Sequence, residues 1–574
     1  MTARRALALI VLAGFAVWAI SAAVSNDSEP TREKSRPSAD GADGEDRLPK
    51  KAYLRAACNL PPEWVRLIHR GWAPGSTRDA DLILVPRPNN YMGSFINTSH
   101  SGPYDFLQNV PLIFYGQGYV PAAGEVSVEG ETTFADVAPT YARLMGFDFP
   151  TRAGAPIEGI FADYDSPPRL IVTAVVDGGG WNVLDYWADA WPNIARLITE
   201  GTSVADVIVG SSPSITPAIH TTLSTGTFPR VHGVTAIAVR NEKGDIVGAF
   251  SPGSNYTGAR LMDPTFSLRT TTLGDVWDKA QGNAPLVGMV ANGNYPLGML
   301  GHGAALEGGD KDTAAIISGF GWDTNPAYYS VPGYLNALPG PEGALRKVDL
   351  MDGRADDQWQ GHDIAPFPGT PALAPWQNVA TKELITREGF GADEVTDLLY
   401  INYKAPDHAG HEWNMIAPEQ EDVLASVDKA IGDLAAFLDS AVGEDAYVLV
   451  ITADHGQTPL EEGGWPINRN EIVADIDSRF DKTVNDTSII QRTSATSFFS
   501  NVAEMRANHV RGEQVASFLS RYTIGANIPE GTDVPEGFED RVDEPIFSAV
   551  FPGRRLPLVV RCTGALQAAE SPGG

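Results

Sequence analysis

The stretch "AYVLVITADHG", residues 446–456, is an apolar run that ends in an acidic residue and a histidine. Its apolar residues do not alternate with polar ones, and this pattern is typical of a strand buried on both faces. Similar runs recur at "DLILVP" (81–86), "VPLIFYG" (110–116), "RLIVTAVVDGGG" (169–180) and "DLLYINY" (397–403), and helical patterns occur at 133–146 and 421–439. The sequence therefore predicts an α/β fold with a mostly parallel central sheet flanked by helices.

Length and charge restrict the class of protein. The 574 residues exceed one ordinary domain but suit a large α/β enzyme with insertions. Hydrophobic residues make up 43% of the chain, which is enough for a large core. The net charge of −30 is spread along the sequence, and it argues against nucleic acid or an anionic membrane surface as a partner.

The N-terminal segment resembles a targeting sequence. An apolar run extends from Ala6 to Val24 after two arginines, so residues 1–24 are either a signal peptide or a membrane anchor. In both cases the rest of the chain lies outside the cytoplasm, and only this segment meets the membrane. The polar, charged residues 25–50 are expected to be a disordered linker. The only two cysteines, Cys58 and Cys562, exclude a C-x-x-C motif, and outside the cell they are permitted to pair.

Acidic residues and histidines follow the ends of three predicted strands. Asp177 ends one apolar run at a Gly-rich turn, and Asp454 and His455 end another. Asp407 and His411 follow the third run four residues apart, so a helical turn would bring both side chains toward one ion. Open α/β sheets bind their ligands at the carboxyl ends of the strands, and these clusters therefore predict a ligand site at that edge.

The stretch "SSPSITPAIHTTLSTGTFPRVHG", residues 211–233, contains a candidate nucleophile. Thr216 precedes Pro217, which is favoured in the first turn of a helix. One interpretation is that Thr216 is simply a helix N-cap, a position at which threonine is common. The other is that its hydroxyl attacks a phosphate, since a helix N-terminus binds anions and a metal ion can activate a hydroxyl.

Four motifs in order, "VVDGGG", "TPAIHTTLSTGTFPRVHG", "PDHAGH" and "TADHG", resemble the alkaline phosphatase superfamily, most of all its type I phosphodiesterase/nucleotide pyrophosphatase branch. The resemblance covers roughly residues 169–456. It implies two zinc ions about 4 Å apart, with Mn²⁺ as an alternative metal. By motif, one ion would be held by Asp177, Thr216, Asp454 and His455, and the other by Asp407 and His411.

The resemblance also implies a third ligand for the second ion, a histidine that the family carries after the D-H-G strand. No such stretch follows His455, but "TSHSGPYDFLQNVPLIFYG" and "FADVAPTYARLMGF", near the start of the chain, match it. His100 is therefore the predicted ligand, and the chain is predicted to be circularly permuted. Permutation requires the two ends of the folded part to lie close together. A Cys58–Cys562 disulfide is expected to staple them.

The implied fold is a permuted alkaline-phosphatase-like catalytic domain over residues 51–570. Residues from about 282 to 375 are rich in Gly, Pro and Asn and are expected to be an insertion that caps or flanks the sheet, from which His302 could face the site.

The implied activity is hydrolysis of small phosphate esters by a phosphodiesterase with a phosphothreonine intermediate at Thr216. A phosphomonoesterase is the alternative within enzymes, and a non-catalytic surface binding protein is the alternative outside them. The branch usually carries an asparagine after the nucleophile helix to hold a phosphoryl oxygen, but Ile237 stands at about this place. Arg240 or Asn241 is the predicted substitute.

Overall fold

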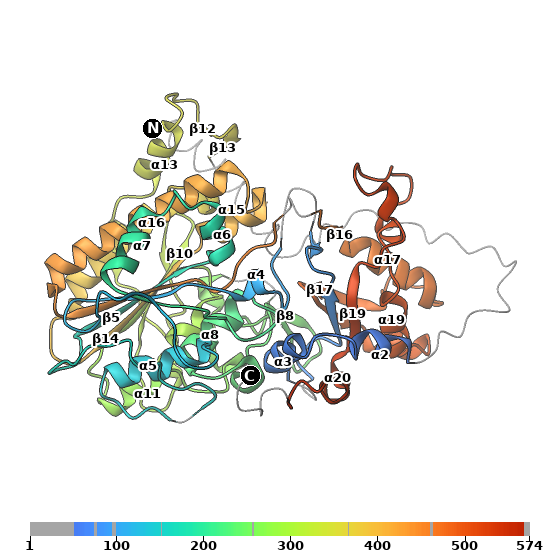
Figure 1. The fold of residues 1–574 in the computed structure, drawn as a ribbon, viewed down its shortest axis with the longest axis horizontal. Helices are drawn as coiled ribbons and strands as arrows, with labels where there is room; N and C mark the ends of the chain where they lie inside the picture. Colours follow the sequence, from blue (N-terminus) through green and yellow to red (C-terminus); the bar gives the residue numbers. More distant parts are fainter. Residues whose placement is uncertain are drawn as a thin grey trace, which may run out of the picture.

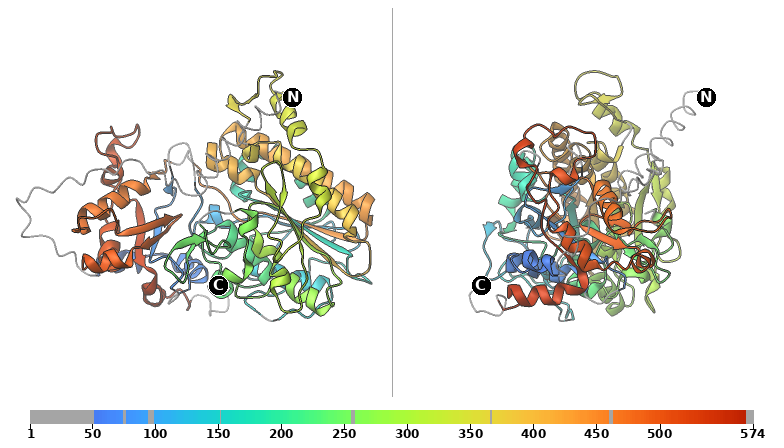
Figure 2. Two further views of the ribbon diagram at one scale, coloured as in Figure 1. Left: turned by 180° about the vertical axis from the view of Figure 1, so that it is seen from behind. Right: turned by 90° about the vertical axis from the view of Figure 1, so that its right-hand side faces the viewer.

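The structure, a computed structural model, describes residues 51–567 except 74–76, 94–98, 151, 255–257, 365–366 and 460–462. The predicted N-terminal segment and linker, residues 1–24 and 25–50, lie outside the described residues. Within the described ranges, no helix combines the length and the apolar character that crossing a membrane requires. The chain forms a large and a small lobe, which lie side by side in Figure 1 and are seen from behind and from one end in Figure 2.

A nine-stranded sheet forms the centre of the large lobe. Its strands are, in spatial order, β11 (Gly321–Asp323), β10 (Thr313–Ser318), β9 (Val287–Asn292), β14 (Asp397–Tyr403), β5 (Leu170–Val176), β15 (Tyr447–Thr452), β3 (Leu112–Tyr115), β6 (Thr202–Val204) and β4 (Gly124–Val126). The five strands from β10 to β15 run parallel, whereas β3 is antiparallel to both of its neighbours. The predicted mostly parallel α/β fold is confirmed.

Alternate residues of the central strands pack into two cores, one on each face of the sheet. In β5, Ile171 and Val175 belong to one core, and Val172 and Ala174 belong to the other. The covering helices are α7 (Pro192–Glu200) and α16 (Pro418–Leu438) on one face and α5 (Val137–Leu144) and α11 (Leu273–Ala280) on the opposite face, as Figure 1 shows. This double burial explains why the strands lack polar alternation in the sequence.

A four-stranded antiparallel sheet forms the small lobe. Its order is β17 (Ile490–Ser494), β18 (Ser497–Ser500), β1 (Leu82–Pro86) and β19 (Phe547–Pro552), and its core includes residues of α2 (Ala52–Ala57), α3 (Pro62–Gly71), α17 (Arg469–Phe480), α19 (Gly512–Leu519) and α20 (Leu556–Thr563). The run 81–86 was expected in the parallel sheet, and its place in β1 corrects that prediction. A fully buried strand has the same sequence pattern in either sheet, so the pattern does not identify its partners.

The two ends of the described chain meet in the small lobe. There α2 contacts β19 and α3 contacts α20, so the blue and red ends of the ribbon lie together in Figure 1. A disulfide joins Cys58, which follows α2, to Cys562 in α20, and their Cα atoms are 5.4 Å apart. This closeness of the ends is the arrangement that a permuted chain requires.

The segment 282–375 differs from its prediction as a capping or flanking insertion, because it supplies β9, β10 and β11 to the central sheet. Its later part leaves the sheet and forms α13 (Glu342–Asp349) and a hairpin of β12 (Gln358–Trp359) and β13 (His362–Asp363), at the edge of the large lobe beyond α16 in Figure 1. These strands lie between Gly- and Asn-rich turns, which obscure their pattern in the sequence.

Candidate active site

Asp177 follows the end of β5, and the next residue in the turn, Gly178, holds a position that only glycine fits well. Gly178 has a φ of +72°, and a Cβ there would lie 2.8 Å from Gln457 Nε2 and 3.1 Å from the Cα of Asp407. The bare backbone lets the N–H of Gly178 donate a hydrogen bond to Asp454 Oδ1 at 3.0 Å. The Gly-rich motif therefore allows the ends of β5 and β15 and the Asp407 segment to approach one another.

The helix α15 (Ala405–Trp413) begins just after β14 and carries Asp407 and His411 on the same face. His411 Nε2 lies 3.4 Å from Asp407 Oδ1, as the spacing of four residues predicts for a helix. His455, which follows β15, lies between the acidic groups. Its Nε2 atom is 3.4 Å from Asp454 Oδ2, 3.6 Å from Asp177 Oδ1 and 3.8 Å from Asp407 Oδ1.

His100 reaches this place from the start of the chain. Its Nε2 atom lies 3.1 Å from Asp407 Oδ1, and its ring lies 5.1 Å from the ring of His411 and stacks on that of His455 at 3.4 Å between centroids. Its Nδ1 atom lies 2.9 Å from the carbonyl oxygen of Ser214. If that nitrogen carries the proton, Nε2 presents a lone pair to the carboxylates, which is how metal-binding histidines are usually oriented.

Thr216 is the first residue of α8 (Thr216–Thr225), and Ile215 holds the N-cap position without a side-chain bond. The N-cap interpretation of Thr216 is therefore corrected by one residue, and its hydroxyl is not used in capping. Instead Thr216 Oγ1 accepts a hydrogen bond from the ammonium of Lys404 at 3.0 Å. We call the following set the Thr216 centre: His100, Asp177, Thr216, Asp407, His411, Asp454 and His455.

Lys404 was missed by the sequence reasoning. It follows β14, is only 7% exposed, and lies 2.9 Å from Asp177 Oδ1 and 2.7 Å from Asp407 Oδ2. The signal was present, because a lysine three residues before Asp407 at the end of a buried strand has few places to put its charge except the site itself.

Several atoms of the Thr216 centre are buried without a hydrogen-bond partner in the described structure. They are Asp407 Oδ1, Asp454 Oδ2 and His455 Nε2. Candidate ligand atoms lie within 4.8 Å of one another in two groups, one of His100, Asp407 and His455 and one of Asp177, Asp454 and His455. Buried oxygen and nitrogen lone pairs without donors fit divalent cations, and the mixture of carboxylate and imidazole suits Zn²⁺.

Burial and the charge of Lys404 determine the protonation of the histidines and aspartates in the Thr216 centre. Burial lowers the pKa of both His100 and His455 to about 4, so the imidazoles are neutral at pH 7 and able to bind a metal. Burial alone would raise the pKa of Asp407, but Lys404 and the neighbouring histidines hold it well below its usual range. Burial and the charge of Asp454 raise the pKa of Asp177.

The predicted substrate-binding residues are not brought into the Thr216 centre. Arg240 ends β7 (Ala238–Arg240). It donates a hydrogen bond at 2.9 Å to Oδ2 of Asp81, an acidic residue of the small lobe. Asn241 accepts hydrogen bonds from the backbone of the following turn. His302 also turns away, because its Nδ1 atom lies 2.7 Å from Asp275 Oδ2. In the described structure, Arg240 therefore pairs with Asp81, Asn241 holds the turn that follows it, and His302 is bound to Asp275 of α11.

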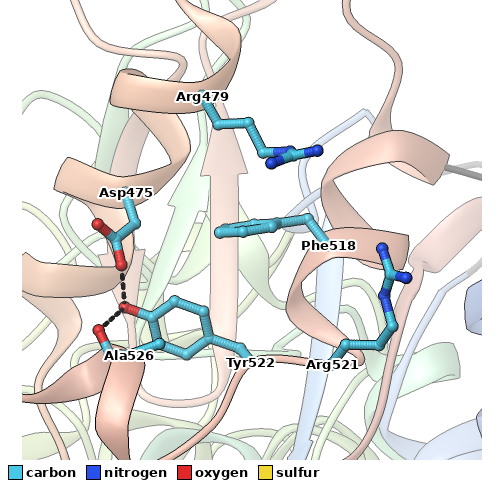
Figure 3. A pocket seen from close by; sticks show the side chains of 6 residues that line it. All are labelled: Asp475, Arg479, Phe518, Arg521, Tyr522 and Ala526. Carbon is cyan, nitrogen blue, oxygen red and sulfur yellow. Dashed lines mark hydrogen bonds between the residues drawn. The ribbon is translucent and has the colours of Figure 1, made fainter. Parts of the chain in front are cut away.

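An open pocket of about 450 Å³ lies in the small lobe, and Figure 3 shows the residues that line it. They are Asp475, Arg479, Phe518, Arg521, Tyr522 and Ala526. The Tyr522 hydroxyl lies 2.5 Å from Asp475 Oδ2, and burial and this carboxylate raise its pKa, so it stays protonated. The lining residues include no member of the Thr216 centre and no activated nucleophile, so the pocket is not the better candidate.

Comparison with known proteins agrees with the geometry. The model of the type I phosphodiesterase / nucleotide pyrophosphatase family matches residues 171–544. A calcium-transporting ATPase of Myroides odoratus is 24% identical over 330 residues, which cover 50% of this chain and 60% of that protein. The alkaline phosphatase PhoV of Synechococcus elongatus is 23% identical over 353 residues, covering 52% and 61%. The matches thus span about 60% of the length of these relatives.

A solved structure supports the fold. The crystal structure of the alkaline phosphatase PafA aligns with a TM-score of 0.52 and 17% identity, over 68% of this chain and 85% of that chain. At this identity the likeness concerns the fold alone. The family match covers more than half of the chain, and it includes the motifs that build most of the Thr216 centre. The chain belongs to the type I phosphodiesterase / nucleotide pyrophosphatase family.

Proposed function

We propose that this protein hydrolyses phosphate esters as a phosphodiesterase or nucleotide pyrophosphatase, through a phosphothreonine at Thr216. One observation carries the proposal: a hydroxyl that has no capping role is held among buried carboxylates and imidazoles whose unpartnered atoms converge. Nucleophilic catalysis needs such an activated hydroxyl in a site that holds positive charge. Membership of the family supports the substrate class.

Two divalent ions, Zn²⁺ or alternatively Mn²⁺, are part of the proposal. One would be held by Asp177, Thr216, Asp454 and His455, and the other by His100, Asp407 and His411. Bound there, the ions would supply the positive charge that activates the nucleophile and stabilises the oxygen of the leaving group. Support comes from the two groups of candidate ligand atoms, one of Asp177, Asp454 and His455 and one of His100, Asp407 and His455, the second of which holds His455 where the proposed set has His411.

The residues of the chain would perform the covalent steps. Thr216 stands at the N-terminus of α8, where free N–H groups and the helix dipole favour a phosphate. Its Oγ1 atom would bond to phosphorus while the bond to the leaving oxygen breaks. Water would then attack phosphorus, and the bond to Oγ1 would break and restore the hydroxyl. Thr216 is only 4% exposed, which limits competing attack by bulk water.

Phosphomonoesterase activity is the second candidate, because relatives and a structure with a similar fold are named alkaline phosphatases. Ile237 adds to it, since an apolar side chain offers no hydrogen bond to a phosphoryl oxygen where the diesterase branch carries an asparagine. A non-catalytic binding protein has less support, because binding alone would not need a buried hydroxyl among candidate metal ligands.

We place the protein outside the cytoplasm, secreted or anchored through residues 1–24, with a small phosphate ester as its partner and no nucleic acid. The Cys58–Cys562 disulfide supports this location, because such bonds persist in oxidising compartments. The net charge of −30 opposes binding to nucleic acid.

The test uses the purified protein with its disulfide intact, loaded with Zn²⁺ or Mn²⁺. Its hydrolysis of bis-p-nitrophenyl phosphate, of the p-nitrophenyl ester of thymidine 5′-phosphate and of p-nitrophenyl phosphate is compared. We expect hydrolysis that depends on metal, with the diesters preferred. Preference for p-nitrophenyl phosphate would select the monoesterase. Absence of turnover on all three, with metal bound, would contradict the proposed function.

A further inference from the structure

The ammonium of Lys404 lies at the middle of the Thr216 centre, and all of its hydrogen bonds end there. Its Nζ atom lies 2.9 Å from Asp177 Oδ1, 2.7 Å from Asp407 Oδ2 and 3.0 Å from Thr216 Oγ1. An ammonium has three N–H donors, so these three acceptors use them all. Lys404 is therefore fixed by contacts to one carboxylate from each predicted ligand set and to the nucleophile.

The contact with Thr216 is not needed to neutralise the carboxylates. Asp177 and Asp407 alone balance the charge of Lys404, and the third N–H of the ammonium is the one that reaches Thr216 Oγ1. In the part of the chain that the structure describes, Lys404 also provides the one hydrogen bond found at Thr216 Oγ1, and the hydroxyl neither caps α8 nor donates to a protein acceptor. The oxygen that would attack phosphorus is therefore oriented by Lys404.

We propose that Lys404 is a catalytic residue that stabilises the charge on Thr216 Oγ1 in both half-reactions, an inference that rests on the proposed function. In the first step Oγ1 bonds to phosphorus, the bond to the leaving oxygen breaks, and the hydroxyl proton passes through solvent to the leaving alcohol. In the second step a water oxygen bonds to phosphorus, the bond to Oγ1 breaks, and Oγ1 takes up a proton released by that water. Lys404 donates a hydrogen bond throughout and transfers no proton.

The position of the charge gives the inference its physical reason. In the first step Oγ1 carries negative charge after its proton has left and before its bond to phosphorus is complete, and in the second step negative charge returns to Oγ1 as that bond breaks. A donor already in place in a buried site stabilises such charge without rearranging, and the loss of one such donor typically lowers turnover about 10²–10³-fold. Asn402, which donates to Asp177 Oδ2 at 2.8 Å, keeps that carboxylate oriented toward Lys404.

The test compares Lys404→Met, whose unbranched side chain is one atom shorter and has no donors, with Lys404→Ala, which leaves space for a small amine. Lys429→Met is the matched control, because Lys429 is an exposed lysine of the same lobe, paired with Asp433. Metal content, kcat and KM on the best p-nitrophenyl substrate, and phosphothreonine trapped by acid quench and mass spectrometry are measured for each. Lys404→Ala and Lys404→Met are also assayed with added ethylammonium.

We expect Lys404→Met to keep as many ions per chain as the unaltered protein, to lose about 10²–10³-fold in kcat, and to keep KM within about threefold. Ethylammonium should restore at least about tenfold to Lys404→Ala and nothing to Lys404→Met, whose side chain fills the space. A structural role would not produce this difference. The control should match the unaltered protein.

Two results would overturn the inference while leaving the proposed function intact. One is a Lys404→Met enzyme within about threefold of normal kcat. The other is metal loss in proportion to activity, which would make Lys404 a counter-ion only. If Lys404→Met does not fold, Lys404→Ala without added amine is judged by the same criteria. An unaltered, metal-loaded protein without any turnover would instead remove the proposed function, and this inference with it.

Discussion

The Thr216 centre and the cluster of Asp278, Asp310 and Asp312 both gather carboxylates in the large lobe, but the pKa of Asp407 in the first is shifted in the opposite direction from those of Asp278 and Asp312 in the second. We call the second set the Asp278 cluster; Asp278 lies in α11, and the other two precede β10. Burial and neighbouring carboxylates raise the pKa of Asp278 to about 6 and that of Asp312 well above its usual range. Asp407, which is also buried, has its pKa held far below the usual range, whereas Asp312 is half-buried.

The difference lies in the cation. In the described ranges no Lys, Arg or His forms an ion pair with the Asp278 cluster, whereas Lys404 contacts two carboxylates of the Thr216 centre. A positive neighbour lowers the pKa of a buried carboxylate, whereas burial and like charges raise it. At Asp407 the cations prevail, but at Asp177, which also faces Asp454, the pKa stays raised. Grouped aspartates therefore do not by themselves indicate a catalytic site. The surrounding groups decide whether the charge is available for chemistry.

The sharpest test of this contrast is Thr216→Ala. We expect turnover to fall at least about 10³-fold, because the nucleophile is lost. Metal content should remain near normal, since the other predicted ligands stay in place. Asp310→Asn, in the Asp278 cluster, is the control and should keep turnover within about twofold. Retained activity in Thr216→Ala would instead indicate Ser214 or direct attack by water.

His100→Ala tests whether the segment at the start of the chain completes the metal centre. We expect the loss of one ion per chain and a fall in turnover of about 10²-fold or more, because metal sites are sensitive even to changes around their ligands. Metal is counted by plasma mass spectrometry after gel filtration. Asp312→Asn should keep both ions. Full metal content in His100→Ala would remove the main support for the permuted arrangement.

Acidification should weaken the metal-free protein through its buried histidines. His100 and His455 have folded pKa values of about 4, below the value of about 6.5 expected for unfolded histidine. Their contribution is present above pH 6.5 and is lost as the pH falls toward 4, by up to about 1.4 kcal/mol per pH unit for each group. Urea unfolding after EDTA treatment, at pH 7.0 and 5.0, measures it. Equal stability at both values would contradict the assigned shifts.

The smallest expected effect is that of Asp278→Asn. This substitution should raise the stability of the protein at neutral pH rather than lower it. The folded pKa of Asp278, about 6, lies above the ordinary value of 3.8, so ionisation costs stability as the pH rises through this range. In buffer without divalent cations, the variant should melt about 1–2 °C higher at pH 7.5 and unchanged below pH 3.8. Asp433→Asn, at an exposed ion pair, controls for the lost charge. A lower melting temperature at pH 7.5 would show that Asp278 is held charged.

The sequence predicted the strands and the polar residues at their ends because burial on both faces leaves a clear pattern, as in β5, β14 and β15. It did not predict that β1 pairs with β19, because that contact joins opposite ends of the chain and a buried strand does not indicate its partner. Arg240 was assigned by position along the chain, but its side chain forms an ion pair with Asp81. Lys404 was missed because a motif records residue types and does not show which three acceptors an ammonium will meet.

The bond between Cys58 and Cys562 turns almost all of the described chain into a closed ring, since the two cysteines are 504 positions apart. A protease that cuts once inside the ring would open a gap without releasing a fragment. The nicked molecule would run as one species on a non-reducing gel and separate into two only after reduction. In surroundings that contain proteases, the first cut would thus leave both lobes in one covalent body.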